Sequence, residues 1–411
     1  MDSLARMRSS RHGGALLVVL LGLMTAFGPL SLDMYLPAFP EIGADLGVPP
    51  AQVQLSLTTC LLGLAAGQLI FGPVSDRLGR RPVAIFGMTA YAVASTAIAL
   101  APSAPTLIGL RFVQGLAGGI GIVVARAIVR DLHSGVAAAK YFSRLTLILG
   151  LAPIAAPALG SVVLRLTSWH GIFVTLGLFG ALLAGLVVTL LPETLADDRR
   201  STGGLGDLLA TARTLFADRI FLGYAVAQGM SLAALFAYIS GSSFVLQDGY
   251  GLTPTTFAVL FGVNACGLLA LSQVNGWLLN RFAPRPLLVA TMIAQVGAGV
   301  IAVVAAVAGL LPLLAVGFFA LVSTIGMVSP NATALALDRH PERAGTAAAL
   351  LGGLQMTIAA LITPLVGALG DPGRGLPTSA VILSASAISL AAVVTLTSAE
   401  GGGSGHGIAH R

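Results

Sequence analysis

Twelve apolar runs of about 20 residues constrain the fold more than any other feature of the sequence. Runs of this length suit membrane-spanning helices, whereas the strands of a membrane barrel are half as long and alternate in polarity. With 56% hydrophobic and 9% charged residues, the composition excludes a soluble globular protein. The predicted spans are residues 15–39, 52–74, 83–101, 106–129, 141–165, 169–191, 219–245, 255–279, 285–308, 311–336, 344–369 and 377–397.

The longest polar stretch, residues 192–218, separates six spans from six. We therefore expect an all-α integral membrane protein with two pseudo-symmetric six-helix bundles, residues 15–191 and 219–397, joined by a cytoplasmic linker over 192–218. Residues 1–14 are expected to form a cytoplasmic N-terminal tail. The Gly-rich residues 398–411 are expected to form a disordered cytoplasmic tail.

The distribution of Lys and Arg predicts the orientation, because basic loops stay in the cytoplasm. Of the 22 basic residues, Arg165 and Arg374 lie in loops on one side, and Arg111 and Arg126 lie inside the fourth span. The other eighteen lie on the side that carries the N-terminus. Both termini and the linker are therefore predicted to be cytoplasmic.

A short charged segment occurs twice, 204 positions apart, which indicates an internal duplication. Its first copy is residues 72–82 (GPVSDRLGRRP) and its second is residues 276–286 (GWLLNRFAPRP). Asp76 of the first copy becomes Asn280 in the second, and Arg80 becomes Pro284. Duplicated halves within a membrane protein are typical of transporters.

Asp33 lies inside the first predicted span, between Pro29 and Pro37. An ionisable side chain costs about 2.5–3.5 kcal/mol at the centre of a membrane helix, so it needs a reason to be there. The flanking prolines weaken the helix and permit a bend where it lines a cavity. Desolvation disfavours the charged carboxylate, so Asp33 can bind and release a proton. The alternative is a structural acid paired with a backbone amide or an arginine.

Two arginines lie inside the fourth span. Arg111 is followed by Gln114 and Gly115, one turn later on the same face. Small residues allow a neighbouring helix to approach, and Arg111 can then reach a backbone carbonyl or a carboxylate. Arg126 lies four turns further along, where it either lines the cytoplasmic end of a cavity or extends to the membrane surface.

The fifth span contains Pro153 and Pro157 among small residues. Two prolines one turn apart predict a kinked helix with a thin packing face. Such a helix suits a moving interface, but kinks also occur in static bundles.

Several classes of function lack their motifs in this sequence. The six histidines form no metal-spaced pair and accompany no nucleophile, so we expect no metal site and no enzyme activity. A nucleotide-binding lysine motif is absent, and no Lys/Arg tract with interleaved aromatics suggests nucleic-acid binding. We expect no cofactor, with protons as the coupling ion, and a monomer whose partners are a small-molecule substrate and the lipid bilayer.

These motifs together resemble the major facilitator superfamily, and within it the drug:proton antiporters of the bicyclomycin/chloramphenicol resistance branch. The superfamily's loop signature is similar to residues 72–82, and the antiporter signature is similar to residues 110–119. The fifth-span signature resembles residues 150–160, with Ala-Pro in place of the more usual Gly-Pro. The branch is indicated by residues 33–37, 125–132, 238–248 and 261–264.

The resemblance implies a role for each matching residue. Asp33 would couple protons to export, and Arg111 would take part in proton transfer and in the electrostatics of the cavity. A cytoplasmic conformational latch would consist of Gly72, Asp76, Arg77, Gly79, Arg80 and Arg81, with Asp131 as a charge partner. Some multidrug members carry a second acid shortly before Asp33. Residues 24–27 (MTAF) lack one, which disfavours multiply cationic drugs.

The sequence therefore predicts a proton-driven exporter of small amphipathic drugs, such as chloramphenicol-like antibiotics, in a bacterial inner membrane. Polar residues within apolar spans would line its cavity alongside Asp33, Arg111 and Arg126; these are Tyr35, Tyr238, Asn264 and Gln355. Each could instead tie helices together. A proton-coupled importer of a nutrient is the first alternative. A membrane enzyme acting on lipids is the second, although the sequence lacks the clustered acids or histidines that it would need.

Overall fold

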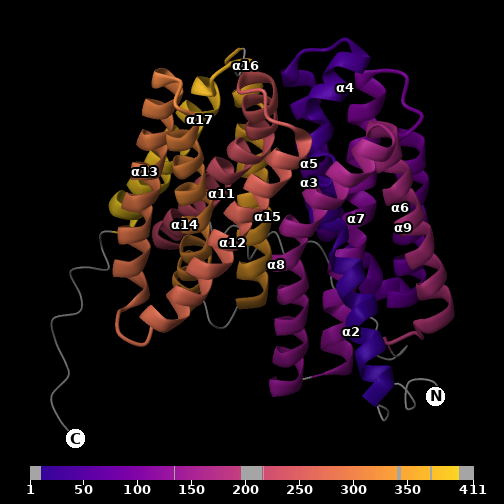
Figure 1. Cartoon of the computed structure of the whole chain (residues 1–411). Coiled ribbons are helices and arrows are strands. Elements are labelled where there is room, and N and C mark those ends of the chain that lie inside the picture. The colour runs from indigo at the N-terminus through magenta and orange to yellow at the C-terminus, as the bar shows by residue number, and fades with distance from the viewer. Residues whose placement is uncertain are drawn as a thin grey trace, which may run out of the picture. The chain divides into compact units, whose positions relative to one another are not determined.

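Every regular element in the described part of the chain is a helix, which confirms the predicted all-α class (Figure 1). The computed structural model describes residues 11–133, 135–195, 215, 217–339, 344–370 and 373–397. The first half contains α2 (Arg11–Thr25), α3 (Phe27–Asp33), η1 (Leu36–Ala38), α4 (Phe39–Leu46), α5 (Pro50–Leu78), α6 (Arg80–Ile98), α7 (Ala104–Leu132), α8 (Gly135–Leu166) and α9 (Trp169–Leu190).

The second half repeats the pattern of long helices. It contains α11 (Arg219–Phe244), the π-helix η3 (Val245–Gly249), α12 (Pro254–Leu278), α13 (Pro284–Ala308), α14 (Leu311–Asp338), α15 (Ala344–Ile362), α16 (Leu365–Ala368) and α17 (Leu376–Leu396). Each of the twelve predicted spans falls on one or more of these helices. Among the described residues, ten helices are long and apolar enough to cross a membrane, and Gly150–Leu166 of α8 is a shorter apolar helix.

Two compact units make up the chain. Unit 1 contains Met1–Thr202 together with Ser243–Val263, and unit 2 contains Gly203–Ser242 together with Asn264–Arg411. The division resembles the two expected bundles, except that the end of α11 and the start of α12 belong to unit 1. Residues 1–10 of the expected N-terminal tail, the expected C-terminal tail and most of the expected linker lie outside the described residues, and α2 begins within the expected N-terminal tail, at Arg11.

The first span is interrupted where its prolines remove backbone hydrogen bonds. A proline has no N–H to donate to the carbonyl four residues earlier. Pro29 therefore leaves the carbonyl of Thr25 without its helical donor, and α2 ends at Thr25. Pro37 does the same for Asp33, where α3 ends. The bend expected around Asp33 is thus an interruption of the regular α-helix, although the joining residues keep helical backbone angles and Leu16–Leu46 forms one span.

Glycines allow α5 and α7 to pack with their backbones in contact. A Cβ added to Gly115 would lie 2.1 Å from the Cys60 carbonyl oxygen, and one added to Gly63 would lie 2.2 Å from the Phe112 carbonyl oxygen. These distances leave no room for a side chain. Small residues of this kind hold membrane helices together through close van der Waals contact.

The same contact recurs in unit 2, which supports the internal duplication. A Cβ on Gly119 would lie 2.5 Å from the Leu64 carbonyl oxygen, and one on Gly326 would lie 2.2 Å from that of Leu268. Leu64 and Leu268 are separated by the 204 positions that relate the two charged segments. The helix pair α5 and α7 therefore corresponds to the pair α12 and α14.

We expect Gly115→Ala to destabilise the protein strongly, because the new methyl group would overlap the Cys60 carbonyl. Overpacking of this kind costs about 1–3 kcal/mol, or more against a rigid backbone. Gly109→Ala is the matched control on the same helix, since a Cβ there meets no described atom within 4 Å. Thermal unfolding in detergent should show a lower midpoint for Gly115→Ala only. Equal midpoints would contradict the close packing of α5 and α7.

The fifth span, α8, runs through Pro153 and Pro157 as one helix. Its thin packing face is present as predicted. A Cβ on Gly160 would lie 1.8 Å from the Met34 carbonyl oxygen, so α8 approaches the break in the first span at backbone distance. A larger residue at position 160 would therefore displace the segment that carries Asp33.

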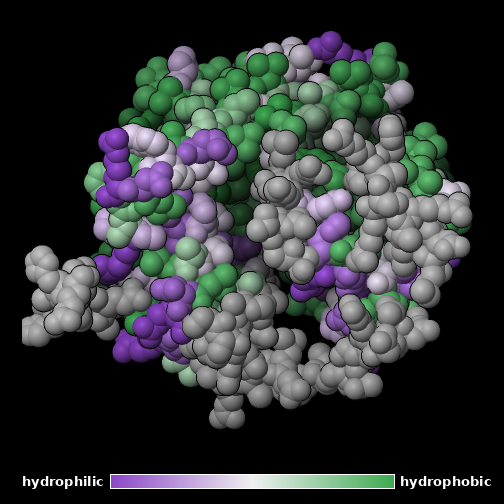
Figure 2. Space-filling model, turned by 90° about the horizontal axis from the view of Figure 1, so that it is seen from below, coloured by the Kyte–Doolittle hydropathy of each residue, from purple (hydrophilic) through white to green (hydrophobic). Residues whose placement is uncertain are grey.

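Many large apolar side chains are exposed on the outside of the helices. Examples are Val93 (65% exposed), Leu178 (67%) and Val307 (67%). Apolar exposure on this scale suits a lipid environment. Figure 2 views the structure from the end where α2 begins, and there hydrophilic residues gather on the face while apolar residues cover the flank.

Candidate functional site

Arg111 of α7 is completely buried in unit 1, and a closed ring of hydrogen bonds holds it. Its Nη2 donates to the Ser31 carbonyl at 2.7 Å, and its Nη1 donates to the Gln114 side-chain oxygen. The Gln114 amide donates to the Ser95 hydroxyl at 2.8 Å, which donates to the Tyr91 carbonyl at 2.7 Å. The Tyr91 and Ser31 hydroxyls, 2.7 Å apart, complete the ring.

This ring fixes Arg111 against the interrupted first span. The Ser31 carbonyl lies in α3, close to the break, and it accepts a bond from α7. Of the two kinds of acceptor expected for Arg111, the structure shows a backbone carbonyl. The guanidinium also lies 4.1 Å from the centre of the Tyr35 ring and 5.7 Å from that of Phe173. Aromatic faces stabilise a desolvated cation.

Tyr35 is fully buried, and its hydroxyl lies 3.2 Å from the Ser56 hydroxyl. Its ring packs on Arg111, so it ties the first span to α5 and α7. In this structure the side chain supports the arginine and does not face an open cavity.

Asp33 is buried, with 6% of its surface exposed, and it ends α3 beside the break. Within the described part of the chain, its carboxyl group has no hydrogen bond or ion pair. Arg111 therefore does not neutralise it in this state. The structural alternative, an acid satisfied by a neighbouring amide or arginine, is not what the described residues show.

The other predicted cavity residues differ in their surroundings. In unit 2, the Asn264 amide donates to the Tyr238 hydroxyl at 2.8 Å, and both side chains are buried. Gln355 of α15 is partly exposed. Arg126 of α7, in unit 1, is exposed and has no hydrogen-bond or ion-pair partner among the described residues.

Unit 2 places an aromatic residue where unit 1 has its arginine. When Gly119 is matched with Gly326, Arg111 corresponds to Phe318 of α14. The Phe318 ring centre lies 5.1 Å from that of Tyr238, much as Arg111 lies over Tyr35. Of these two matched positions, only the one in unit 1 therefore carries a buried cation.

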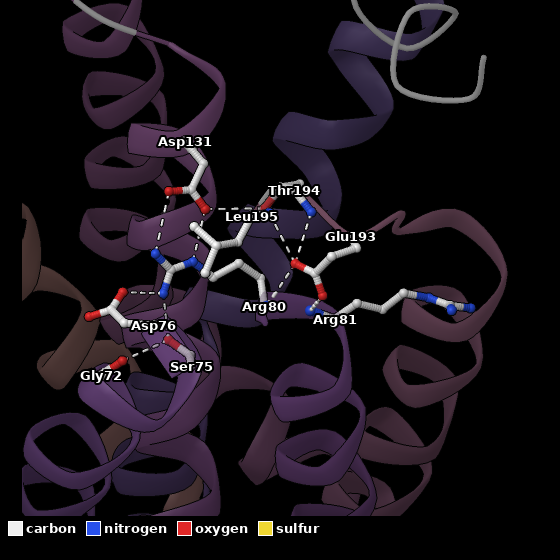
Figure 3. A network of polar contacts seen from close by, with 9 residues as sticks. All are labelled: Gly72, Ser75, Asp76, Arg80, Arg81, Asp131, Glu193, Thr194 and Leu195. Atoms are coloured by element: carbon white, nitrogen blue, oxygen red, sulfur yellow. Dashed lines mark hydrogen bonds and ion pairs between the residues drawn. The ribbon is translucent and has the colours of Figure 1, made fainter. Parts of the chain in front are cut away.

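At the end of unit 1 where α2 begins, Arg80 joins two acidic residues (Figure 3). Its Nη1 lies 2.5 Å from Asp76 and 2.7 Å from the Ser75 hydroxyl, and its Nε lies 2.8 Å from Asp131. The Arg80 side chain is 6% exposed, against 15% for Asp131 and 44% for Asp76. The predicted partnership of Asp131 with the charged segment is therefore present, and it runs through Arg80.

Glu193, which the sequence analysis did not single out, binds the start of α6. Its carboxylate accepts the backbone N–H groups of Arg80 at 2.8 Å and Arg81 at 3.1 Å. A carboxylate at a helix N-terminus satisfies free donors and interacts well with the helix dipole. Gly79 has a φ of 99°, and a Cβ there would lie 2.5 Å from Glu193. Both facts explain the glycine.

The second copy of the charged segment lacks this network. Pro284 replaces Arg80 and Asn280 replaces Asp76, so the ion pair has no counterpart. Arg285, the counterpart of Arg81, donates to the Thr397 carbonyl at 3.3 Å. Among the described residues, no group of three or more His, Cys, Asp or Glu could hold a metal ion.

Known proteins agree with this architecture. Residues 21–364 match the family model described as Major Facilitator Superfamily. The chain is 41% identical to the MFS-type transporter YdgK of Bacillus subtilis, covering 85% of this chain and 88% of that protein. It is 33% identical to a bicyclomycin resistance protein homolog of Haemophilus influenzae, covering 86% and 89%.

A solved structure of the nucleoside transporter NupG shares the fold. Its TM-score is 0.75 at 12% identity, covering 93% of this chain and 99% of that one. Members of the matched family are transporters and not enzymes, and they need no cofactor. The chain therefore belongs to the Major Facilitator Superfamily as a multi-pass membrane transporter of small molecules, on the branch of the bicyclomycin-resistance relatives.

Proposed function

We propose that this transporter is a proton-coupled antiporter that exports small amphipathic drugs by alternating access, with chloramphenicol-like antibiotics as the leading candidates. The similarity to a relative named for bicyclomycin resistance supports drug export. The proposal places the protein in a bacterial inner membrane, as a monomer with both termini in the cytoplasm.

One observation carries the proton coupling. The Asp33 carboxyl is buried at a helix break and has no partner among the described residues. The charge of a buried carboxyl group depends on its access to water and on the groups that a bound substrate brings beside it. A site that alternates between two sides of a membrane changes both.

Asp33 and Arg111 then have different tasks. Deprotonated Asp33 favours binding of the drug from the cytoplasm, and a proton from outside displaces the drug and resets the site. Arg111 remains charged and keeps the Ser31 carbonyl, and hence the break, in place. Each proton entering down 100 mV supplies about 2.3 kcal/mol. This energy supports an accumulation ratio of a few tens per proton.

The other candidate residues divide into two groups under this proposal. Arg126 and Gln355 are accessible enough to contact a substrate directly. Tyr35, Tyr238 and Asn264 are bonded within their units and would shape the site through helix packing in this state. The cytoplasmic conformational latch is a separate feature. It consists of Gly72, Asp76, Arg77, Gly79, Arg80, Arg81 and Asp131, to which we add Glu193.

Expression in an efflux-deficient bacterial host tests the proposal. We expect the cells to become more resistant to chloramphenicol or bicyclomycin and to accumulate less of the drug. A protonophore should restore accumulation to the level of the empty-vector control, because it removes the driving force. Unchanged accumulation across a panel of amphipathic antibiotics would contradict drug export. Increased uptake would instead support a proton-coupled importer.

A further inference from the structure

The end of α11 and the start of α12 belong to unit 1, whereas the rest of both helices belongs to unit 2. α11 passes from unit 2 to unit 1 between Ser242 and Ser243, and α12 returns between Val263 and Asn264. We call residues 243–263 the crossing segment. It contains the π-helix η3, an uncommon form of helix that is frequently found at functional sites.

Two side chains of the crossing segment bind the interrupted first span. The Ser243 hydroxyl donates to the Leu36 carbonyl at 2.5 Å. The Gln247 amide donates to the Pro37 carbonyl at 3.2 Å and to the Ser243 hydroxyl at 2.8 Å. The Leu36 carbonyl has no donor four residues further on, because residue 40 is proline, and within η1 it accepts the Phe39 N–H instead. Ser243 adds a second bond to this carbonyl from outside the first span.

The attachment combines these hydrogen bonds with apolar packing. Next to these bonds the rings of Phe39 and Phe244 pack with their centres 5.6 Å apart. Further along the segment, Arg165 Nε of α8 donates to the Thr255 hydroxyl at 2.9 Å. A cavity of about 280 Å³ opens beside this bond, so the segment is not closely packed there. The two bonds to the first span are neutral, and a neutral hydrogen bond contributes only about 0.5–1.5 kcal/mol to stability, so these bonds can break and re-form at modest cost.

The bonded carbonyls lie close to the proposed proton site. Leu36 and Pro37 are three and four residues beyond Asp33, on the short stretch between α3 and α4. Any movement of the crossing segment therefore pulls on the part of the first span that carries the acid. This arrangement connects one end of unit 1 to Asp33 without a direct contact.

We propose that Ser243 and Gln247 form a releasable latch that holds the crossing segment on the first span in this state. Release of the two bonds lets residues 243–263 move away from Leu36 and Pro37 and opens this end of the site. The latch binds the stretch between α3 and α4, and α4 lies at the end of unit 1 opposite to the start of α2 (Figure 1). It rests on the proposed alternating-access transport and adds the two residues that keep this end closed.

Distances between spin labels test the latch. The labels go on Gln52→Cys and Thr256→Cys, which are exposed positions at the starts of α5 and α12. Both native cysteines are replaced, as Cys60→Ala and Cys266→Ala. We expect the purified protein to give mainly one short distance. In Ser243→Ala/Gln247→Leu, the ratio of a longer distance to the short one should rise roughly tenfold, as expected for two lost hydrogen bonds.

Ser242→Ala is the matched control. Its hydroxyl is buried next to Ser243 and has no hydrogen-bond partner among the described residues. It should leave the distances unchanged. If the double variant unfolds, Gln247→Leu alone at its partly exposed position should still increase the longer distance. A folded variant with the unaltered distance distribution would overturn the latch.

The measurement requires neither a drug nor a proton gradient. A shift in distances with no drug efflux would therefore refute the proposed function and leave the latch intact. Proton-driven efflux with unchanged distances would refute the latch alone.

Discussion

Asp33→Asn is expected to abolish proton-driven drug efflux while leaving the protein folded in the membrane. Asparagine has nearly the same size and polarity, but it cannot release a proton, so the site stays in one charge state. Efflux driven by a pH gradient should fall at least tenfold, because the variant no longer uses the free energy that one proton supplies when it crosses the membrane. Drug binding without a gradient should persist. Drug accumulation in cells and binding to purified protein measure the two effects.

Asp45→Asn is the control for removing an acid from the same segment of the chain. Asp45 lies in α4 and accepts the Trp169 indole N–H at 2.9 Å, a bond that an asparagine oxygen can also accept. This variant should retain efflux. Normal proton-driven efflux by Asp33→Asn would remove the basis of the proposed coupling.

Arg80→Gln is expected to have the largest effect on stability among variants of the charged segment. Removing one partner of a buried ion pair costs about 3–5 kcal/mol, and less here because the Asp76 side chain is 44% exposed. Glutamine leaves the Asp76 and Asp131 carboxylates without their shared cation. The midpoint of thermal unfolding should fall by about 5 °C or more, and transport should fall with it if the network stabilises one transport state.

The duplicated segment offers the matched control for this variant. Arg285→Gln removes an arginine from the second copy, where Arg285 donates to the Thr397 carbonyl and Pro284 replaces Arg80. Its unfolding midpoint should fall by less than half as much. Equal losses in the two variants would mean that the arginines act only as surface charges.

The sequence predicted the helical spans well because a bilayer fixes both their length and their composition. The break in the first span was foreseeable in the same way, since Pro29 and Pro37 each remove a known backbone bond. The position of Asp33 between these prolines indicated an acid at a bend that lines a cavity. In the structure Asp33 is buried at the end of α3.

The partner of Arg111 could not be read from the sequence. The Ser31 carbonyl lies 80 positions away, and only the packing of α3 against α7 brings the two together. Tyr35 shows the same limit. Tyr35 was expected either to line a cavity or to tie helices together, and in this structure its hydroxyl lies near Ser56 of α5 while Arg111 packs on its ring.

The charged segment shows how much of a motif can be explained from neighbouring residues in the sequence. Three neighbouring arginines, Arg77, Arg80 and Arg81, look equivalent in the sequence, but the start of α6 at Arg80 turns this side chain toward Asp131. Glu193 lies more than a hundred positions later, so its bond to the start of α6 was not predictable from the segment. Its place directly after Pro192, at the end of the sixth span, was the one available indication.

Drug movement in proteoliposomes under an imposed pH gradient tests the central claim most directly. The purified transporter is reconstituted with the drug inside and outside at equal concentration, and the pH on one side is then lowered. Proton-coupled antiport predicts that the drug accumulates on the acidic side, and that Asp33→Asn shows no accumulation. Accumulation on the alkaline side, or a distribution that ignores the gradient, would contradict the account.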